Sequence, residues 1–202
     1  MTKLEKLKAD LRGLGELAVA FSGGADSSLL LRAAHDALGE RAIGITIRSP
    51  YMSSREIAEA VEFARIYSIR HEILELGVAE EIKDNPENRC YLCKKAAFSR
   101  LIERACELGF SRVADGTNRD DLGEYRPGLK AKEELGVLSP LINLTKSEIR
   151  ELSRELNLPT AEKPSYACLL TRLPHGREID ESELNLIEAA ENLLIASGYA
   201  NV

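Results

Sequence analysis

The chain has 202 residues, of which 44% are hydrophobic and 30% charged, a composition typical of one soluble domain or of one domain with a small appendage. The formal net charge of −6 provides no overall positive field, which argues against a nucleic-acid partner. No apolar run approaches the roughly 20 residues of a membrane span, and the N-terminus has an amphipathic helical pattern, not that of a signal peptide. We therefore expect a cytoplasmic protein with no membrane partner, whose four cysteines are reduced or metal-bound.

Predicted helices and strands alternate through the first part of the chain. Helical leucine spacing predicts a first helix that ends near Gly13, and short apolar runs predict four strands. The predicted strands cover 17–21, 42–47, 71–76 and 112–114, and the helices between them cover 27–38, 55–67 and a segment that follows Cys93 and ends near 108. This alternation predicts an α/β fold, a doubly wound parallel sheet with helices on both faces. Ligands of such sheets bind beyond the carboxyl ends of the strands, so the polar motifs at 22–27, 48–52 and 115–118 are expected to converge.

The regular alternation fades after Asn118. Thr145 and Glu148 have capping-box spacing before a helix that ends by Pro159, and Asp180 and Glu183 have the same spacing before a last helix. We therefore divide the chain into an α/β domain at 1–145 and a C-terminal helical segment at 146–202 that carries Cys168.

The strand at 17–21 runs into the sequence SGGADS and then into a helix. The two glycines let backbone N–H groups approach a phosphate closely, and the helix start adds unsatisfied donors and the positive end of its dipole. The serines add hydroxyl donors, and the single carboxylate can hold Mg²⁺ between phosphates. The residues expected to bind phosphate and metal are Ser22, Gly23, Gly24, Asp26 and Ser27.

This loop contains no lysine, so it is not a Walker A loop, whose lysine contacts the β- and γ-phosphates. The Ser-Gly-Gly-x-Asp-Ser pattern instead resembles the PP-loop of the ATP pyrophosphatases. That resemblance implies ATP and Mg²⁺ as ligands, and chemistry at the α-phosphate. A substrate oxygen attacks there, AMP is transferred and pyrophosphate leaves.

Three cysteines form a second candidate site. Cys90 and Cys93 make a C-x-x-C pair, and Cys168 lies far along the chain. A structural zinc site wants four ligands, and none of the three histidines has ligand-like spacing. Three thiolates suit a [4Fe–4S] cluster with one open iron, while redox chemistry and unligated thiols stay open as alternatives. Cys106 has helical spacing with Ile102, and we expect it to be a small buried hydrophobe.

Several motifs occur in one order along nearly the whole chain. They are the SGGADS loop, NRCYLCK at 88–94, DGTN at 115–118, YRPG at 125–128 and PSYACL at 164–169. This series resembles the LarE-type ATP-dependent sulfur transferases, which help make the nickel-pincer cofactor of lactate racemase. The resemblance implies adenylylation of the carboxylates of pyridinium-3,5-biscarboxylic acid mononucleotide, a small-molecule nucleotide substrate, followed by their replacement with thiocarboxylates.

The family has two branches that differ in their source of sulfur. One branch sacrifices the sulfur of a cysteine at the position of Cys168. The other carries two extra cysteines and is thought to bind a cluster that delivers exogenous sulfide. With Cys90 and Cys93 present, the sequence resembles the second branch, which implies that sulfide or another sulfur donor is a partner and that Cys168 is the third cluster ligand. Family members usually continue past the Tyr199 region, so the resemblance also implies a truncated or short form. The oligomeric state stays open, with a homo-oligomer as one alternative.

Two arginines are further candidate site residues. Arg126 and Arg172 are candidate phosphate ligands, because guanidinium binds phosphate bidentately, but either could equally form a surface ion pair.

The nearest rival function is tRNA 2-thiolation, against which the acidic composition counts. Amide-forming ligases of the same superfamily need an ammonia source, and no glutaminase segment is visible. A non-catalytic nucleotide-binding metal protein is the rival from a different class.

Overall fold

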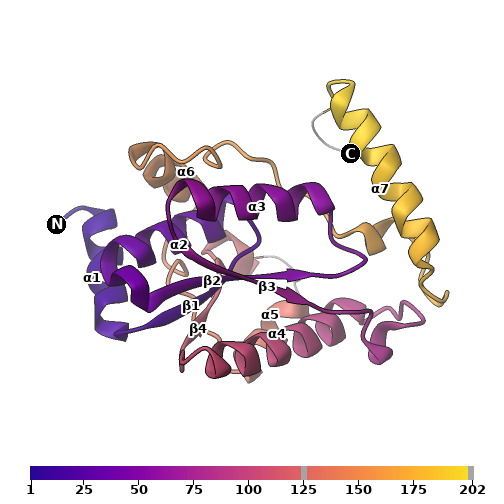
Figure 1. Cartoon of the computed structure of the whole chain (residues 1–202), viewed down its shortest axis with the longest axis horizontal. Coiled ribbons are helices and arrows are strands. Elements are labelled where there is room, and N and C mark those ends of the chain that lie inside the picture. The colour runs from indigo at the N-terminus through magenta and orange to yellow at the C-terminus, as the bar shows by residue number, and fades with distance from the viewer. Residues whose placement is uncertain (124–126, 200–202) are drawn as a thin grey trace.

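The fold is a three-layer sandwich in which a parallel sheet lies between helices (Figure 1). The structure, a computed structural model, describes residues 1–123 and 127–199. The strands are β1 Leu17–Ala20, β2 Ala42–Arg48, β3 Arg70–Glu75 and β4 Val113–Ala114. The helices are α1 Lys3–Leu14, α2 Ala25–Leu38, α3 Ser54–Ile66, α4 Arg89–Glu107, α5 Pro127–Glu134, α6 Lys146–Glu155 and α7 Glu181–Ala196. Four short 3₁₀ helices, Gly39–Arg41, Glu80–Ile82, Asp120–Gly123 and Leu169–Arg172, lie in the connections.

The sheet confirms the predicted doubly wound parallel arrangement. Its strand order is β3-β2-β1-β4, and β1 pairs in parallel with β2 on one side and with β4 on the other. The chain therefore reverses its direction of strand addition between β3 and β4, beside β1. A ligand site is expected at that switch point, beyond the carboxyl end of β1.

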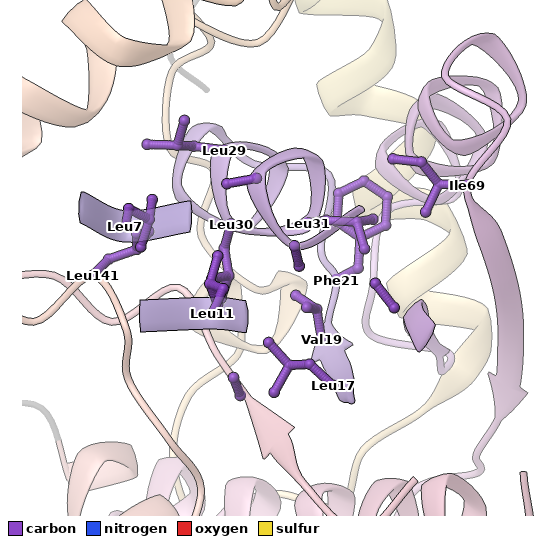
Figure 2. Packing of buried hydrophobic residues seen from close by; sticks show 14 of the residues in the cluster. Leu7, Leu11, Leu17, Val19, Phe21, Leu29, Leu30, Leu31, Ile69 and Leu141 are labelled. Carbon is purple, nitrogen blue, oxygen red and sulfur yellow. The ribbon is translucent and has the colours of Figure 1, made fainter. Parts of the chain in front are cut away.

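Alternate residues of β1 enter two different cores. Leu17 and Val19 pack with leucines of α1 and α2, and Figure 2 shows Leu11 and Leu30 beside them. Phe63 of α3 and Ile149 of α6 join the same core, so four helices cover this face. Because β1 is buried on both faces, its sequence is continuously apolar, as parallel strands require.

The opposite face of the sheet is covered mainly by α4. Ala18 of β1 and Ile45 of β2 pack there with Leu101 and Ala105 of α4. Cys106 is the residue after Ala105, about 100° further round the helix, and it is exposed. The expectation that Cys106 is buried is therefore wrong.

A third core attaches the C-terminal segment. Leu169 and Leu170 of the 3₁₀ helix that follows Cys168 pack with Leu184 of α7 and with Tyr51, which follows β2. This cluster places the Cys168 segment beside the carboxyl end of the sheet.

Two helix starts differ from expectation. Helix α4 begins at Arg89 with Asn88 as its N-cap residue, so the C-x-x-C pair lies inside the first turns of the helix instead of before it. At α7, Asp180 caps the backbone N–H of Ser182, but Glu183 pairs with Arg177 and does not close a capping box. The predicted box of Thr145 and Glu148 on α6 is confirmed.

Among the described residues, no helix combines the length and apolar character that a membrane crossing needs.

Candidate active site

The SGGADS loop joins β1 to α2 through a tight turn. Gly23 has φ of +73°, a conformation that favours glycine, and Gly24 is the N-cap residue of α2 without any side-chain cap. The first N–H groups of α2 therefore receive no capping oxygen from Gly24 and remain available to an anion. The Oγ atoms of Ser22 and Ser27 lie 3.1 Å apart across the turn and hold its shape.

The end of β4 lies directly against this loop. A Cβ atom on Gly116 would lie 2.9 Å from the backbone nitrogen of Ser27 and 3.0 Å from Cβ of Asp26, so only glycine allows the two segments to approach this closely. The DGTN motif thus meets the SGGADS loop at 22–27, called the phosphate loop below, as the parallel topology predicts.

Asp115 is buried beside Gly116 in a network of donors. The Nζ atom of Lys132 in α5 contacts the Asp115 carboxylate, and the hydroxyls of Thr117 and Ser139 donate to it at 2.7 and 2.9 Å. Burial alone would raise the pKa of Asp115, but the positive charge of Lys132 and these hydrogen bonds lower it below its ordinary value. This network fixes the segment that follows β4.

The metal-binding candidate Asp26 has two polar neighbours that the sequence did not reveal. Lys146 Nζ, at the first residue of α6, donates to Asp26 Oδ2 at 2.6 Å, and Asn118 Nδ2 donates to Oδ1 at 3.4 Å. The capping box marks Lys146 as the start of a helix, but no local pattern shows that this helix begins beside the phosphate loop. A positive charge therefore reaches the loop from a distant part of the chain.

A cavity of about 930 Å³ lies at the carboxyl ends of β1, β2 and β4, which confirms the expected convergence of the three motifs. Such a volume lies within the range of small-molecule and cofactor sites. Several of the expected site residues line this cavity, namely Ser22, Gly24, Asp26, Ser27, Cys90 and Cys168.

Tyr51 lies between the cysteines. Its backbone carbonyl accepts a hydrogen bond from Cys168 Sγ at 3.5 Å, and its hydroxyl accepts one from Cys93 Sγ at 3.3 Å. Although Cys168 is exposed as a residue, protein atoms surround its thiol, and this desolvation raises the pKa of the thiol to about 11, while the Leu170 backbone hydrogen bond and the positive charge of Lys94 act in the opposite direction. The surroundings of Cys168 therefore favour the neutral thiol.

The three candidate cluster ligands are not gathered in one place. Cys90 and Cys168 line the large cavity, whereas Cys93 lines a neighbouring cavity of about 200 Å³ that shares Tyr51 with it. Within 1–123 and 127–199, no three cysteine, histidine or carboxylate side chains form a group able to hold a metal ion. As they lie, these thiols do not fit a three-cysteine cluster.

Only one of the two arginine candidates lies among the described residues. Arg172 donates through Nε to Glu191 of α7 at 2.7 Å, and it is not among the described residues that line the large cavity. Arg126 lies outside the described residues.

The parallel sheet, the switch-point loop and the carboxylate at the start of α2 together define a PP-loop ATP pyrophosphatase. The fold is similar to that of the NH3-dependent NAD synthetase of Campylobacter jejuni, with a TM-score of 0.58 at 18% identity, covering 98% of this chain and 88% of that one.

Proteins of similar sequence identify the family within this class. No model of a known protein family matches the chain. The chain is 39% identical to an uncharacterized protein of Synechocystis over 100% of its length and 76% of that protein. It is 32% identical to the pyridinium-3,5-bisthiocarboxylic acid mononucleotide synthase of Lactiplantibacillus plantarum, over 100% of this chain and 75% of that one. The chain belongs to the LarE family, to which this synthase also belongs.

Proposed function

We propose that the protein is an ATP-dependent sulfur transferase that converts a carboxylate of pyridinium-3,5-biscarboxylic acid mononucleotide into a thiocarboxylate. The observation that carries the proposal is that one cavity is lined both by the phosphate loop and by Cys168. Adenylylation needs the phosphate loop next to the substrate carboxylate, and sulfur transfer needs Cys168 next to the same carboxylate once it is activated.

In the first half-reaction, a substrate carboxylate oxygen attacks the α-phosphorus of ATP. The bond from that phosphorus to the bridging oxygen breaks, and pyrophosphate leaves with the electron pair. Ser22, Gly23, Gly24 and Ser27 would hold the departing pyrophosphate through N–H and hydroxyl donors. Mg²⁺, held by Asp26, would neutralise phosphate charge. Lys146 brings a second positive charge to the same place, 2.6 Å from the Asp26 carboxylate.

In the second half-reaction, a sulfur nucleophile attacks the carbonyl carbon of the acyl adenylate, and the carbon–oxygen bond to AMP breaks. Cys168 is the residue proposed to present sulfur at this carbon. Attack by its own Sγ gives a thioester, and the thiocarboxylate is released when Cα loses a proton and the Cβ–Sγ bond breaks, which leaves dehydroalanine at position 168. The Cys168 thiol must lose a proton first, and Lys94, which lines the cavity, favours the thiolate. Sulfide placed beside Cys168 would complete the same substitution without oxidation or reduction, giving thiocarboxylate, AMP and a proton. A reducing cytoplasm suits either route, because the thiol must stay free.

The finer proposal for the sulfur source is a [4Fe–4S] cluster on Cys90, Cys93 and Cys168. Because the three thiols do not lie together in the structure, binding of this cluster requires a rearrangement around Tyr51. Neither half-reaction described above depends on the cluster. Iron and sulfide analysis of protein purified without oxygen decides the point, with about four irons per chain as the result that supports it. Stoichiometric zinc, or no metal, would leave Cys168 and added sulfide as the sulfur sources. A homo-oligomer is a separate proposal, and analytical ultracentrifugation, which measures the mass of the protein in solution, tests it.

The function is tested by mixing the protein with ATP, Mg²⁺, sulfide and the biscarboxylic mononucleotide. We expect pyrophosphate release that depends on the mononucleotide, and a thiocarboxylate product detected by mass spectrometry. Cys168→Ser, assayed without added sulfide, is the control that separates the two half-reactions, since it should release pyrophosphate without forming the thiocarboxylate. Pyrophosphate release that depends on tRNA, and not on the mononucleotide, would support tRNA thiolation and overturn the proposal.

A further inference from the structure

We propose that Lys163 is a positioning residue that locks the phosphate loop to the segment carrying Cys168, so that ATP binding and placement of the thiol depend on one buried ammonium group. The inference rests on the proposed function, because it assigns a role to Lys163 within that same site.

Lys163 contacts the phosphate loop and α3 simultaneously. Its side chain is only 10% exposed, and Nζ donates to the backbone carbonyl oxygen of Gly23 at 3.0 Å. The same Nζ lies 2.6 Å from Glu59 Oε2 and 3.7 Å from Glu56 Oε1, both on α3. A buried ammonium is stable only when it is paired in this way, so its geometry is well determined.

The bond to Gly23 bears on the shape of the loop. With φ of +73°, Gly23 makes the left-handed turn that brings the loop's N–H groups toward an anion. The bond from Lys163 engages the Gly23 carbonyl oxygen, and Lys163 is not among the described residues that line the large cavity. A carbonyl oxygen left free to turn toward a phosphate would repel it. The loop is held from α3 as well, because a Cβ atom on Gly23 would lie 3.1 Å from Cβ of Ala60.

The segment that follows Lys163 is held along α3 up to Cys168. The Arg55 guanidinium lies 4.5 Å from the ring centroid of Tyr166, and Arg55 donates to Glu59 at 3.2 Å, the same carboxylate that pairs with Lys163. Beyond Tyr166, Cys168 is held on the Tyr51 carbonyl. A displacement of the loop at Gly23 is therefore transmitted through Lys163 to the start of a short segment that ends at Cys168.

The test measures coupling between ATP and the Cys168 thiol, which a merely structural ion pair would not provide. Alkylation of Cys168 by iodoacetamide is followed by peptide mass spectrometry with and without ATP and Mg²⁺, and ATP affinity is measured by calorimetry. In the wild-type protein we expect ATP to change the alkylation rate of Cys168 several-fold. In Lys163→Met we expect this effect to disappear and the Kd for ATP to rise by about tenfold or more, the range for loss of a charged hydrogen bond.

Three further variants keep the result interpretable. Glu59→Gln keeps the bond from Lys163 to Gly23, so it should retain the ATP effect even if stability falls. The double variant Lys163→Met with Glu59→Gln removes the carboxylate that the single change leaves without its buried partner, and it replaces the single variant if that one does not fold. Lys8→Met breaks a comparably shielded pair with Asp36, at 2.7 Å and away from the cavity, and should leave the ATP effect intact.

The outcomes separate this inference from the proposed function. If the wild-type protein binds no ATP, the proposed function and the inference both fail. If the wild type binds ATP and couples it to Cys168, but the folded Lys163 variant retains the affinity and the coupling, the inference alone is overturned. It is also overturned if Cys168 alkylation in the wild type does not respond to ATP.

Discussion

Lys146 Nζ lies 2.6 Å from Asp26 Oδ2, although the two residues are 120 positions apart in the sequence. Asp26 lies in the first turn of α2, and Lys146 is the first residue of α6. Both side chains are about three-quarters shielded from solvent. The phosphate loop contains no lysine of its own, and this contact brings the Lys146 ammonium group to it. The loop contributes backbone donors and a carboxylate, and α6 contributes the ammonium group.

Replacing Asp26 with alanine should abolish pyrophosphate release while leaving the fold intact. The carboxylate is the acidic side chain of a loop otherwise built from neutral donors, and a metal must offset phosphate charge there. We expect the rate to fall by about 10²-fold or more, the range seen when a preorganised electrostatic contact is removed. Pyrophosphate assay and circular dichroism check the two parts of the prediction. A variant that releases pyrophosphate at the wild-type rate would remove Asp26 from the mechanism.

Replacing Lys146 with methionine should weaken ATP binding by about tenfold, because a charged hydrogen-bond donor is lost while the apolar part of the side chain is kept. Lys130→Met, which removes an exposed lysine on α5, is the matched control and should bind ATP as the wild type does. Calorimetric titration with ATP and Mg²⁺ measures both. Equal affinities for the two variants would show that Lys146 only pairs with Asp26 and does not bind phosphate.

The phosphate loop was predictable because its signal is local. An apolar strand, two glycines and a helix start are adjacent in the sequence, and together they determine both structure and chemistry. The sheet followed for the same reason, since each strand and helix carries its own periodic pattern. The partners of this loop were not predictable in that way. No local pattern distinguishes Lys146 and Lys163 from other charged residues. Only the fold shows that Lys146 contacts Asp26 and that Lys163 contacts Gly23.

The cysteines show where sequence spacing misleads. Helical spacing with Ile102 placed Cys106 on the inward face, but the sheet is covered by the stripe that includes Leu101 and Ala105, and Cys106 lies outside it. The C-x-x-C pattern indicated a shared ligand site. Because helix α4 begins before the pair, its two thiols lie in early turns of the helix, and they line different cavities. Choosing between metal binding and free thiols needs the position of each Sγ atom, which spacing does not provide.

The Asp115–Lys132 pair should make a pH-dependent contribution to stability. Replacing Asp115 with asparagine leaves the largely buried Lys132 ammonium without its carboxylate, so the free energy of unfolding should fall by about 3 kcal/mol at neutral pH. The folded-state pKa of Asp115 lies below its ordinary value of about 4, so its stabilising contribution is fully present above that pH. It is lost as the pH falls through the folded-state pKa, and the difference between wild type and variant should shrink there.

Urea unfolding at several pH values between about 8 and 3 measures this difference, provided that both proteins unfold in a two-state transition. Glu62→Gln, which removes an exposed pair with Arg65, is the control and should change stability little at any pH. A constant difference between wild type and Asp115→Asn across the acid range would contradict the assigned ionisation.

The last prediction separates the cysteines by function. Cys168→Ser should release pyrophosphate but form no thiocarboxylate in the absence of added sulfide, because serine keeps the shape of the side chain and removes its sulfur. Cys106→Ser should retain both half-reactions, because Cys106 is exposed on α4 and is not among the described residues that line either cavity. Each product is measured by mass spectrometry after a single turnover, so that sulfur from the protein is not confused with sulfur from the buffer. Added sulfide should restore product in Cys168→Ser if sulfide itself attacks the acyl adenylate, and should not restore it if Cys168 must carry the sulfur. Loss of product from Cys106→Ser, with Cys168→Ser unaffected, would show that Cys168 is not the residue that presents sulfur to the activated carboxylate.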